Sequence, residues 1–130
     1  MTVQSYRELE VWQFAMDLAE KCYQATKCFP KEELFGLTSQ IRRAAVSVPS
    51  NIAEGQGRLS SREFIQFLSI ARGSICELQT QLEIARALGF GKPELIDEAE
   101  RISHEVGKMI FAFLGSLQNQ PARELTTVSC

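Results

Sequence analysis

The side chains with the clearest potential for chemistry lie in residues 37–58, LTSQIRRAAVSVPSNIAEGQGR. Wound into a helix at about 100° per residue, this stretch places its polar side chains in one row. The members of this polar row are Arg43, Ser47, Ser50, Asn51 and Glu54. Hydroxyl and amide groups one turn apart, with a cation at one end and a carboxylate at the other, favour a partly buried helix or subunit interface. Arg43 and Glu54 would then neutralise each other across that interface.

The alternative chemistry for the same segment is phosphate binding through arginines. The candidate cations are Arg42, Arg43, Arg58 and Arg62. Residues 37–72 carry five arginines against two glutamates, a net charge of +3, whereas residues 94–105 carry five carboxylates against one arginine, a net charge of −4. The whole chain has a net charge of −2, which argues against a general polyanion binder. We therefore expect one basic and one acidic region.

Metal and catalytic chemistry lack the residues that they need. Helical bundles with two metal ions use Glu-x-x-His pairs, but this chain has one histidine, His104, and Arg101 stands three positions before it. One histidine cannot complete the usual metal ligand sets, and no serine or cysteine has a plausible histidine base. Gly55-Gln56-Gly57 lacks the lysine and the preceding strand of a phosphate-binding loop. We expect a non-enzymatic protein without metal or another cofactor.

Length and composition are typical of one globular domain. The chain has 130 residues, of which 45% are hydrophobic and 23% charged, enough for a single core without disulfides or metals. No apolar run approaches the roughly 18 residues of a membrane span. The first residues, MTVQSYRELEVW, carry acidic groups where a signal peptide would have a basic and then an apolar region. We therefore expect a cytoplasmic protein without a membrane span.

The four cysteines fit neither a redox pair nor the spacing of zinc knuckles. Free cysteine commonly packs as a small hydrophobe. We therefore expect Cys22, Cys28 and Cys76 to be buried reduced thiols, and the last residue, Cys130, to be exposed.

Hydrophobic periodicity predicts four helices, at about residues 6–28, 37–55, 60–88 and 93–117. Joined by short connections, helices of this length form an all-α, up-down-up-down antiparallel four-helix bundle. From residue 118 the periodicity is lost, and residues 118–130 are predicted to be a disordered tail.

Local signals support these boundaries. Two helix starts have the spacing of a capping box, Ser5 with Glu8 and Ser60 with Glu63. Pro49 falls inside the second helix, where it removes a backbone hydrogen bond, and we expect a kink there. The glycines at 55 and 57 are expected to supply the positive backbone angles that end this helix.

Some apolar and small residues are left over after the core of one bundle is filled. They are Trp12, Met16, Ala19 and Tyr23 along the first helix and Val46, Pro49 and Ala53 on the second. Exposed apolar patches of this kind commonly mark interfaces. In the third helix, Gly73 and Ser74 are poor helix formers. Because both are small, we expect another helix to approach closely at this point.

The stretch LTSQIRRAAVSVPSNIAEGQGRLSSREFIQFLSIARGSICELQTQLEIA, with LEVWQFAMDLA before it, closely resembles the four-helix bundle proteins encoded in intervening sequences of bacterial 23S ribosomal RNA genes. The resemblance covers roughly residues 9–90. It is specific, because the order QIRRAAVSVPSNIAEG, then GRLSSREF, then GSICEL contains residues that a generic bundle does not need. The fourth helix is similar only as an amphipathic helix.

The resemblance implies a left-handed bundle that assembles into a homopentameric ring. It also implies a relation to the accessory variability protein of diversity-generating retroelements, a basic pentamer that binds nucleic acid and a reverse transcriptase. Carried over by position, the nucleic-acid-binding cations are Arg42, Arg43, Arg58 and Arg62. The structural signature is carried by Pro49, Ser50, Asn51, Glu54 and Gly55, with Arg43 and Ser47 beside them. This chain departs from its basic relative in a pI near 5.5, which weakens phosphate attraction.

Two functions remain in view. The first is a self-assembling accessory factor for RNA or a ribonucleoprotein, whose partners are copies of itself and RNA or a nucleic-acid enzyme. The second is an oligomeric protein-interaction scaffold without a nucleic-acid role, which the net negative charge and the acidic fourth helix favour.

Overall fold

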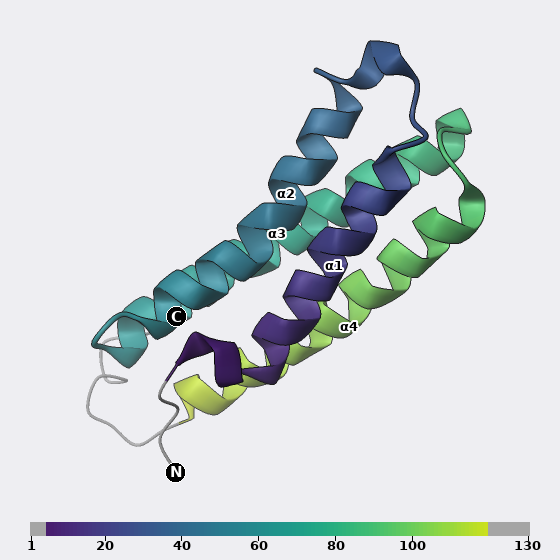
Figure 1. Ribbon diagram of the computed structural model, residues 1–130. Coiled ribbons are helices and arrows are strands. Elements are labelled where there is room, and N and C mark those ends of the chain that lie inside the picture. The colour runs from purple at the N-terminus through teal and green to yellow at the C-terminus, as the bar shows by residue number, and fades with distance from the viewer. Residues whose placement is uncertain (1–4, 120–130) are drawn as a thin grey trace.

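The computed structural model describes residues 5–119. Its elements are η1 (Tyr6–Glu8), α1 (Glu10–Thr26), η2 (Lys31–Glu33), α2 (Leu37–Gln56), α3 (Ser61–Leu88) and α4 (Pro93–Gln118) (Figure 1). The predicted four long helices are confirmed, and the described residues contain no strand. None of these helices combines the length and hydropathy that crossing a bilayer requires.

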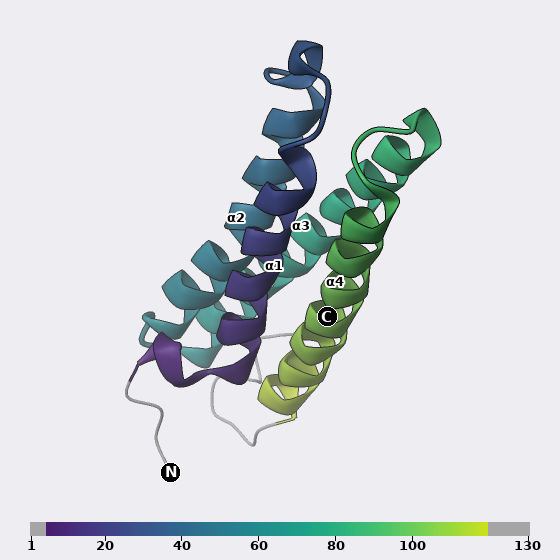
Figure 2. The same ribbon diagram turned by 45° about the vertical axis from the view of Figure 1, so that its right-hand side comes forward.

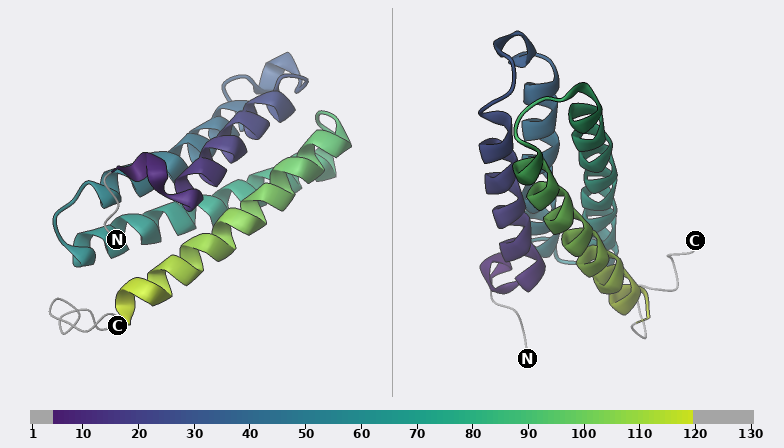
Figure 3. Two further views of the ribbon diagram at one scale, coloured as in Figure 1. Left: turned by 60° about the horizontal axis from the view of Figure 1, so that its bottom comes forward. Right: turned by 90° about the vertical axis from the view of Figure 1, so that its right-hand side faces the viewer.

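The four long helices lie around one core (Figure 2 and Figure 3). α1 and α3 each pack against both α2 and α4, so the α1–α2 and α2–α3 pairs form adjoining sides of the bundle. Each helix contributes fully buried side chains, among them Leu18, Ile52, Leu82 and Ile110. Burial of a side chain of this size contributes about 1.5–3 kcal/mol to folding. This core holds the outward-facing residues of α2 in place.

The first helix begins later than the periodicity predicts. Ser5 caps the short 3₁₀ turn η1, because its Oγ accepts a hydrogen bond from the backbone N–H of Arg7 at 3.1 Å. Leu9 then adopts an extended conformation (φ −76°, ψ 125°) and packs into the core. Tyr6 turns back onto Trp12, with ring centroids 5.2 Å apart. These contacts favour a break in the chain, so α1 starts at Glu10 and ends at Thr26 instead of spanning residues 6–28.

The boundaries of α2 have local causes. The backbone N–H of Leu37 donates to Glu33 Oε1 at 3.0 Å, which satisfies one free donor at the helix start. The helix continues through Pro49 to Gln56 without an interruption. Gly57 follows with φ −77°, so the predicted positive backbone angle is wrong at this glycine. Gly55 serves close packing instead, since a Cβ atom there would lie 2.7 Å from Cβ of Phe67 on α3.

The ends of α3 agree with the sequence signals. Ser60 Oγ accepts a hydrogen bond from the backbone N–H of Glu63 at 3.1 Å, as the capping-box spacing predicts. The helix ends before Gly89, which has φ 74° and donates its N–H to the last turn. α4 then begins with Pro93 in its first turn. The last described residues extend α4 to Gln118, and the rest of the predicted tail lies outside the described residues.

The prediction of three buried cysteines is wrong for two of them. Cys22 is fully buried on α1, and burial raises the pKa of its thiol to about 12. Cys28 follows the end of α1 and is exposed, and Cys76 is exposed because it lies on the outer face of α3. Cys130 lies outside the described residues.

Candidate nucleic-acid interface

The centre of the polar row faces α3. Ser47 Oγ lies 2.8 Å from Ser74 Oγ, and the two hydroxyls share a hydrogen bond across the α2–α3 interface. Asn51 Nδ2 donates to Ser47 Oγ at 2.9 Å and to the Ser47 carbonyl oxygen at 2.8 Å. Ser74 is buried, so these bonds satisfy a polar group inside the bundle.

The two ends of the polar row do not meet within the chain. Glu54 accepts a hydrogen bond from Arg58 Nη2 at 2.8 Å. Arg43 is exposed and has no hydrogen-bond or ion-pair partner among residues 5–119. Since the two residues lie three turns apart on one helix, the rise of about 1.5 Å per residue separates them by roughly 16 Å. The expected neutralisation of Arg43 by Glu54 therefore does not occur within one chain.

Arg42 is held against α1. Its Nε donates to Thr26 Oγ1 at 2.9 Å, and its guanidinium carbon lies 4.6 Å from the centroid of the Tyr23 ring. Thr26 is buried, and its own hydroxyl donates a hydrogen bond to the carbonyl oxygen of Cys22 at 2.8 Å. These contacts fix the orientation of the Arg42 side chain and leave part of its guanidinium for other ligands.

The second pair of candidate cations lies at the turn between α2 and α3. Arg58 pairs with Glu54 at 2.8 Å and lies 3.9 Å from Glu63, and its guanidinium carbon is 4.8 Å from the Phe67 ring centroid. Two carboxylates therefore neutralise this arginine. Arg62, by contrast, is exposed and has no hydrogen-bond or ion-pair partner in the described part of the chain.

The structure does not bring the four candidate arginines together. Arg42 and Arg43 lie in the first half of α2, whereas Arg58 and Arg62 follow its end, more than about 20 Å away along the helix axis. A single phosphate cannot contact both pairs. A ligand that reaches both must be extended along α2, as a nucleic-acid strand is.

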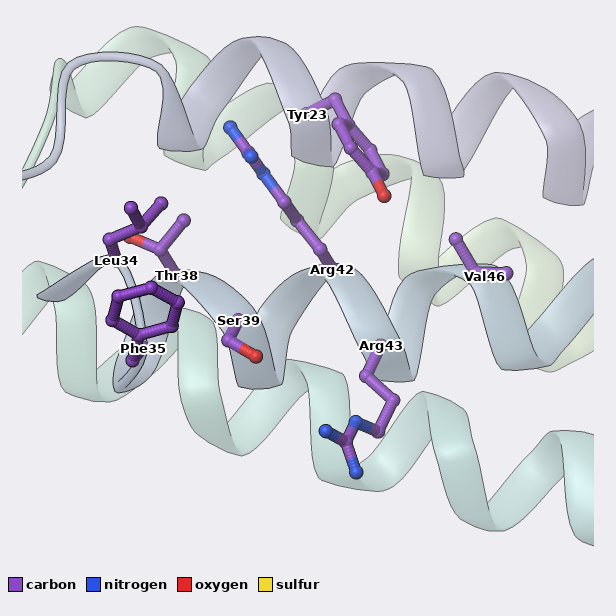
Figure 4. A pocket seen from close by; sticks show the side chains of 8 residues that line it. All are labelled: Tyr23, Leu34, Phe35, Thr38, Ser39, Arg42, Arg43 and Val46. Carbon is purple, nitrogen blue, oxygen red and sulfur yellow. The ribbon is translucent and has the colours of Figure 1, made fainter.

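A groove of about 500 Å³ borders the first pair (Figure 4). Tyr23 and Val46 line it at one end, and Leu34 and Phe35 line it at the other. In Figure 4 Arg42 extends toward Tyr23, while Arg43 points the other way from α2. The ring of Phe35 is 93% exposed, which is unusual for an aromatic side chain. The groove therefore combines arginine with aromatic and aliphatic surface.

Phe35 and Thr26 also belong to this site, although they were not predicted from the sequence. Phe35 stands between Leu34 and Gly36 in the short connection KEELFG, where an aromatic residue in a loop was the available signal. Thr26 is sixteen positions from Arg42, so their contact depends on how α1 packs against α2, and spacing along the chain does not reveal it.

A separate charged cluster joins α3 to the acidic α4. Arg86 pairs with Asp97 at 2.5 Å and also with Glu100. Burial raises the pKa of the Glu100 carboxyl, as does a hydrogen bond with Glu83, while Arg86 opposes the shift. His104 lies nearby, with Nδ1 3.3 Å from Gln79 Nε2. Within residues 5–119, no three His, Cys, Asp or Glu side chains are grouped to hold a metal ion.

Known proteins resemble this chain in sequence and in fold. The family model described as 23S rRNA-intervening sequence protein matches residues 7–112. A solved structure of a protein of unknown function from the S23 ribosomal protein family of Bacteroides thetaiotaomicron VPI-5482 has a TM-score of 0.72 and 22% sequence identity, over 80% of this chain and 97% of that one. At this identity the likeness shows a shared fold. No curated protein matches the chain. Because the family model covers most of its length, the chain belongs to the family of 23S rRNA-intervening sequence proteins.

Proposed function

We propose that this protein is a non-enzymatic, cytoplasmic accessory factor for RNA or a ribonucleoprotein, and that it works as a homo-oligomer. The observation that carries the proposal is Arg43. Its guanidinium is exposed, lacks a partner among the described residues, and borders the same groove as the exposed ring of Phe35. A cation that no carboxylate of the described residues neutralises, on the border of a groove that also holds an open aromatic face, can bind a phosphate while a base stacks on the ring.

The four candidate arginines have unequal roles in this proposal. Arg43 and Arg62 are the phosphate-binding cations, because no carboxylate in the described residues competes for them. Arg42 helps by presenting a guanidinium already oriented by Tyr23 and Thr26. Arg58 contributes least, since Glu54 and Glu63 already surround it. With few available cations and a net charge of −2, affinity depends on several copies binding one RNA.

The proposal includes an assembly. An up-down-up-down antiparallel bundle that forms a homopentameric ring would place five copies of the Arg43 groove on one particle. The signature from Pro49 to Gly55 supports a relation to the accessory variability protein of diversity-generating retroelements, whose ring binds nucleic acid.

A second candidate function is an oligomeric protein scaffold without a nucleic-acid role. The acidic surface of α4 supports it, because like charge repels phosphate. A partner protein would then use the same exposed aromatic and aliphatic residues.

RNA binding separates these functions. The affinity for a labelled hairpin RNA is measured by fluorescence anisotropy at two salt concentrations, about 50 and about 200 mM. Arg43→Ala is expected to weaken binding about tenfold at the lower salt and to reduce the salt slope by about 1. The matched control is Arg101→Ala, which removes an exposed arginine of the acidic α4. Equal affinities for the two variants, or no binding by the parent protein, would contradict the RNA role.

A further inference from the structure

An outward-facing row on α3 has the spacing of a helix-packing seam. Its members, which we call the α3 seam, are Ile70, Gly73, Glu77, Thr80, Ile84 and Ala87. They alternate three and four positions apart, so they lie on one side of the helix. All six are exposed, and Ile70 and Ile84 keep 51% and 44% of their surface in contact with solvent. Ser74, which follows Gly73, is buried against Ser47 of α2, whereas the α3 seam faces outward from the bundle.

Gly73 is a second unusual feature of this seam, because a glycine stands in the middle of a helix. Glycine within a helix costs about 1 kcal/mol relative to alanine. The predicted close approach of another helix at Gly73 and Ser74 occurs at Ser74, which contacts Ser47 of α2. A Cβ atom added at Gly73, however, would meet nothing within 4 Å. No packing within the described chain therefore explains the glycine. A helix from outside the chain would use the space that it leaves.

Another part of the bundle carries a groove. The hollows between α1 and α2 form one continuous surface, the α1–α2 groove, because two of them, of about 360 and 500 Å³, share Val46. Its principal lining residues are Trp12, Met16, Ala19, Tyr23, Val46 and Pro49. Met16 and Val46 are 38% and 43% exposed, so apolar surface faces solvent on the groove floor and rim.

The two surfaces are a helix ridge and a groove between two helices, and their charges have opposite sign. The side-chain ridge of one helix packs into the groove between two others, which is the usual geometry of helix packing. The α3 seam has one charged member, Glu77, which has no hydrogen-bond or ion-pair partner among residues 5–119. The α1–α2 groove is bordered by Arg42 and Arg43 and continues toward Lys27 and Lys31. The seam therefore carries a negative charge, and positive charges border the groove.

We propose that the α3 seam of one copy docks into the α1–α2 groove of the next copy along Trp12, Met16 and Val46. Phe35 and Arg43, which points away from Tyr23 (Figure 4), then stay open for RNA. This inference rests on the self-assembly in the proposed function and names the surfaces that make it. The contact is heterologous, because two different surfaces of the same chain meet, and such contacts generate closed rings or open filaments. The seam faces outward from α3 and the groove lies between α1 and α2, so the two surfaces lie on different parts of the bundle.

Two surface variants and their mixture test the contact by light-scattering mass. Val46→Glu places a charge in the groove, and Ile84→Lys places one on the seam. Each is expected to reduce the mass of the purified protein to that of one chain, 14.6 kDa. Mixed in equal amounts, the two variants still offer one intact seam and one intact groove. The mixture is therefore expected to form a dimer of one copy of each and nothing larger.

Phe111→Glu is the matched control, because Phe111 is 61% exposed on α4 and belongs to neither surface. It should keep the parent mass, and circular dichroism should show all three variants helical. A seam variant that keeps the parent mass, or a mixture without the dimer, overturns the inference while leaving self-assembly and RNA binding intact. A parent protein that is itself monomeric overturns the proposed assembly as well, and RNA binding is then judged separately by the Arg43→Ala variant.

Discussion

The hydroxyl groups of Ser47 and Ser74 lie 2.8 Å apart and join α2 to α3 across their interface. Asn51 donates to the same Ser47 hydroxyl at 2.9 Å, so three side chains form one hydrogen-bonded network. The network uses the inner part of the polar row for packing. The outer residues of the row, Arg43 and Ser50, remain at the surface. One edge of the polar row thus packs inside the bundle, and the other edge is exposed.

Removing the central hydroxyl of this network should destabilise the fold. Ser47→Ala leaves the buried hydroxyl of Ser74 without its partner, which is expected to cost about 1–2 kcal/mol of the free energy of unfolding. Urea denaturation followed by circular dichroism measures this difference. Ser50→Ala, in the same row but exposed, is the control and should change stability little. Equal losses for the two variants would mean that the network does not stabilise the bundle.

Gly55 should tolerate no side chain. In Gly55→Ala the new Cβ would lie 2.7 Å from Cβ of Phe67 and 2.9 Å from Cδ1 of Phe64, so α2 and α3 must move apart. We expect a loss of about 1–3 kcal/mol, although alanine is the better helix former. Gly115→Ala on α4 meets nothing within 4 Å and should gain up to about 1 kcal/mol. Thermal unfolding of both variants checks the opposite signs, and a stabilised Gly55→Ala would refute the close packing.

These packing contacts also show what the sequence could predict. The start of α2 at Leu37, the capping of α3 by Ser60 and its end at Gly89 agree with local signals, because each depends on residues within one turn. The start of α1 could not be predicted, since Leu9 leaves the helix to enter the core. The exposure of Cys76 escaped prediction because cysteine occupies both buried and surface positions on a helix.

The candidate site was also predictable from the sequence only in part. The polar row followed from helical spacing, and its contact with Ser74 occurs where two small residues, Gly73 and Ser74, follow each other in α3. The neutralisation of Arg58 by Glu54 is a contact four positions apart, which spacing can suggest. The contact of Arg42 with Thr26 and the exposure of Phe35 depend on the packing of α1 and on the path of the connection before α2.

The carboxylates beside Arg86 should make stability depend on pH. Burial raises the pKa of Glu100, and so does its hydrogen bond with Glu83. The folded protein therefore binds the Glu100 proton more tightly than the unfolded chain does. The stability that protonated Glu100 contributes is lost as the pH rises from the ordinary pKa of glutamate through the raised pKa of the folded state. Glu83→Gln should flatten that decline and raise stability at neutral pH. Urea midpoints at mildly acidic and neutral pH measure the change, and an unaltered pH profile would contradict the assignment.

The cysteines should differ sharply in reactivity. Cys28 and Cys76 are exposed, whereas burial holds Cys22 as a thiol with a pKa near 12. In a Cys130→Ser background, an alkylating reagent at neutral pH should modify the two exposed thiols quickly and Cys22 only when the protein unfolds. Mass spectrometry of the modified protein reports each site. Rapid modification of Cys22 without denaturant would show that α1 opens readily.

The most direct test of the proposed function is light-scattering mass after size exclusion, with and without a structured RNA, at low and high salt. We predict a multimer of 14.6 kDa chains, near five copies, whose mass rises with RNA at low salt and returns to the protein value at high salt. A multimer whose mass is the same with and without RNA at both salt concentrations would contradict the RNA role. A single chain of 14.6 kDa under all conditions would contradict the assembly on which the account depends.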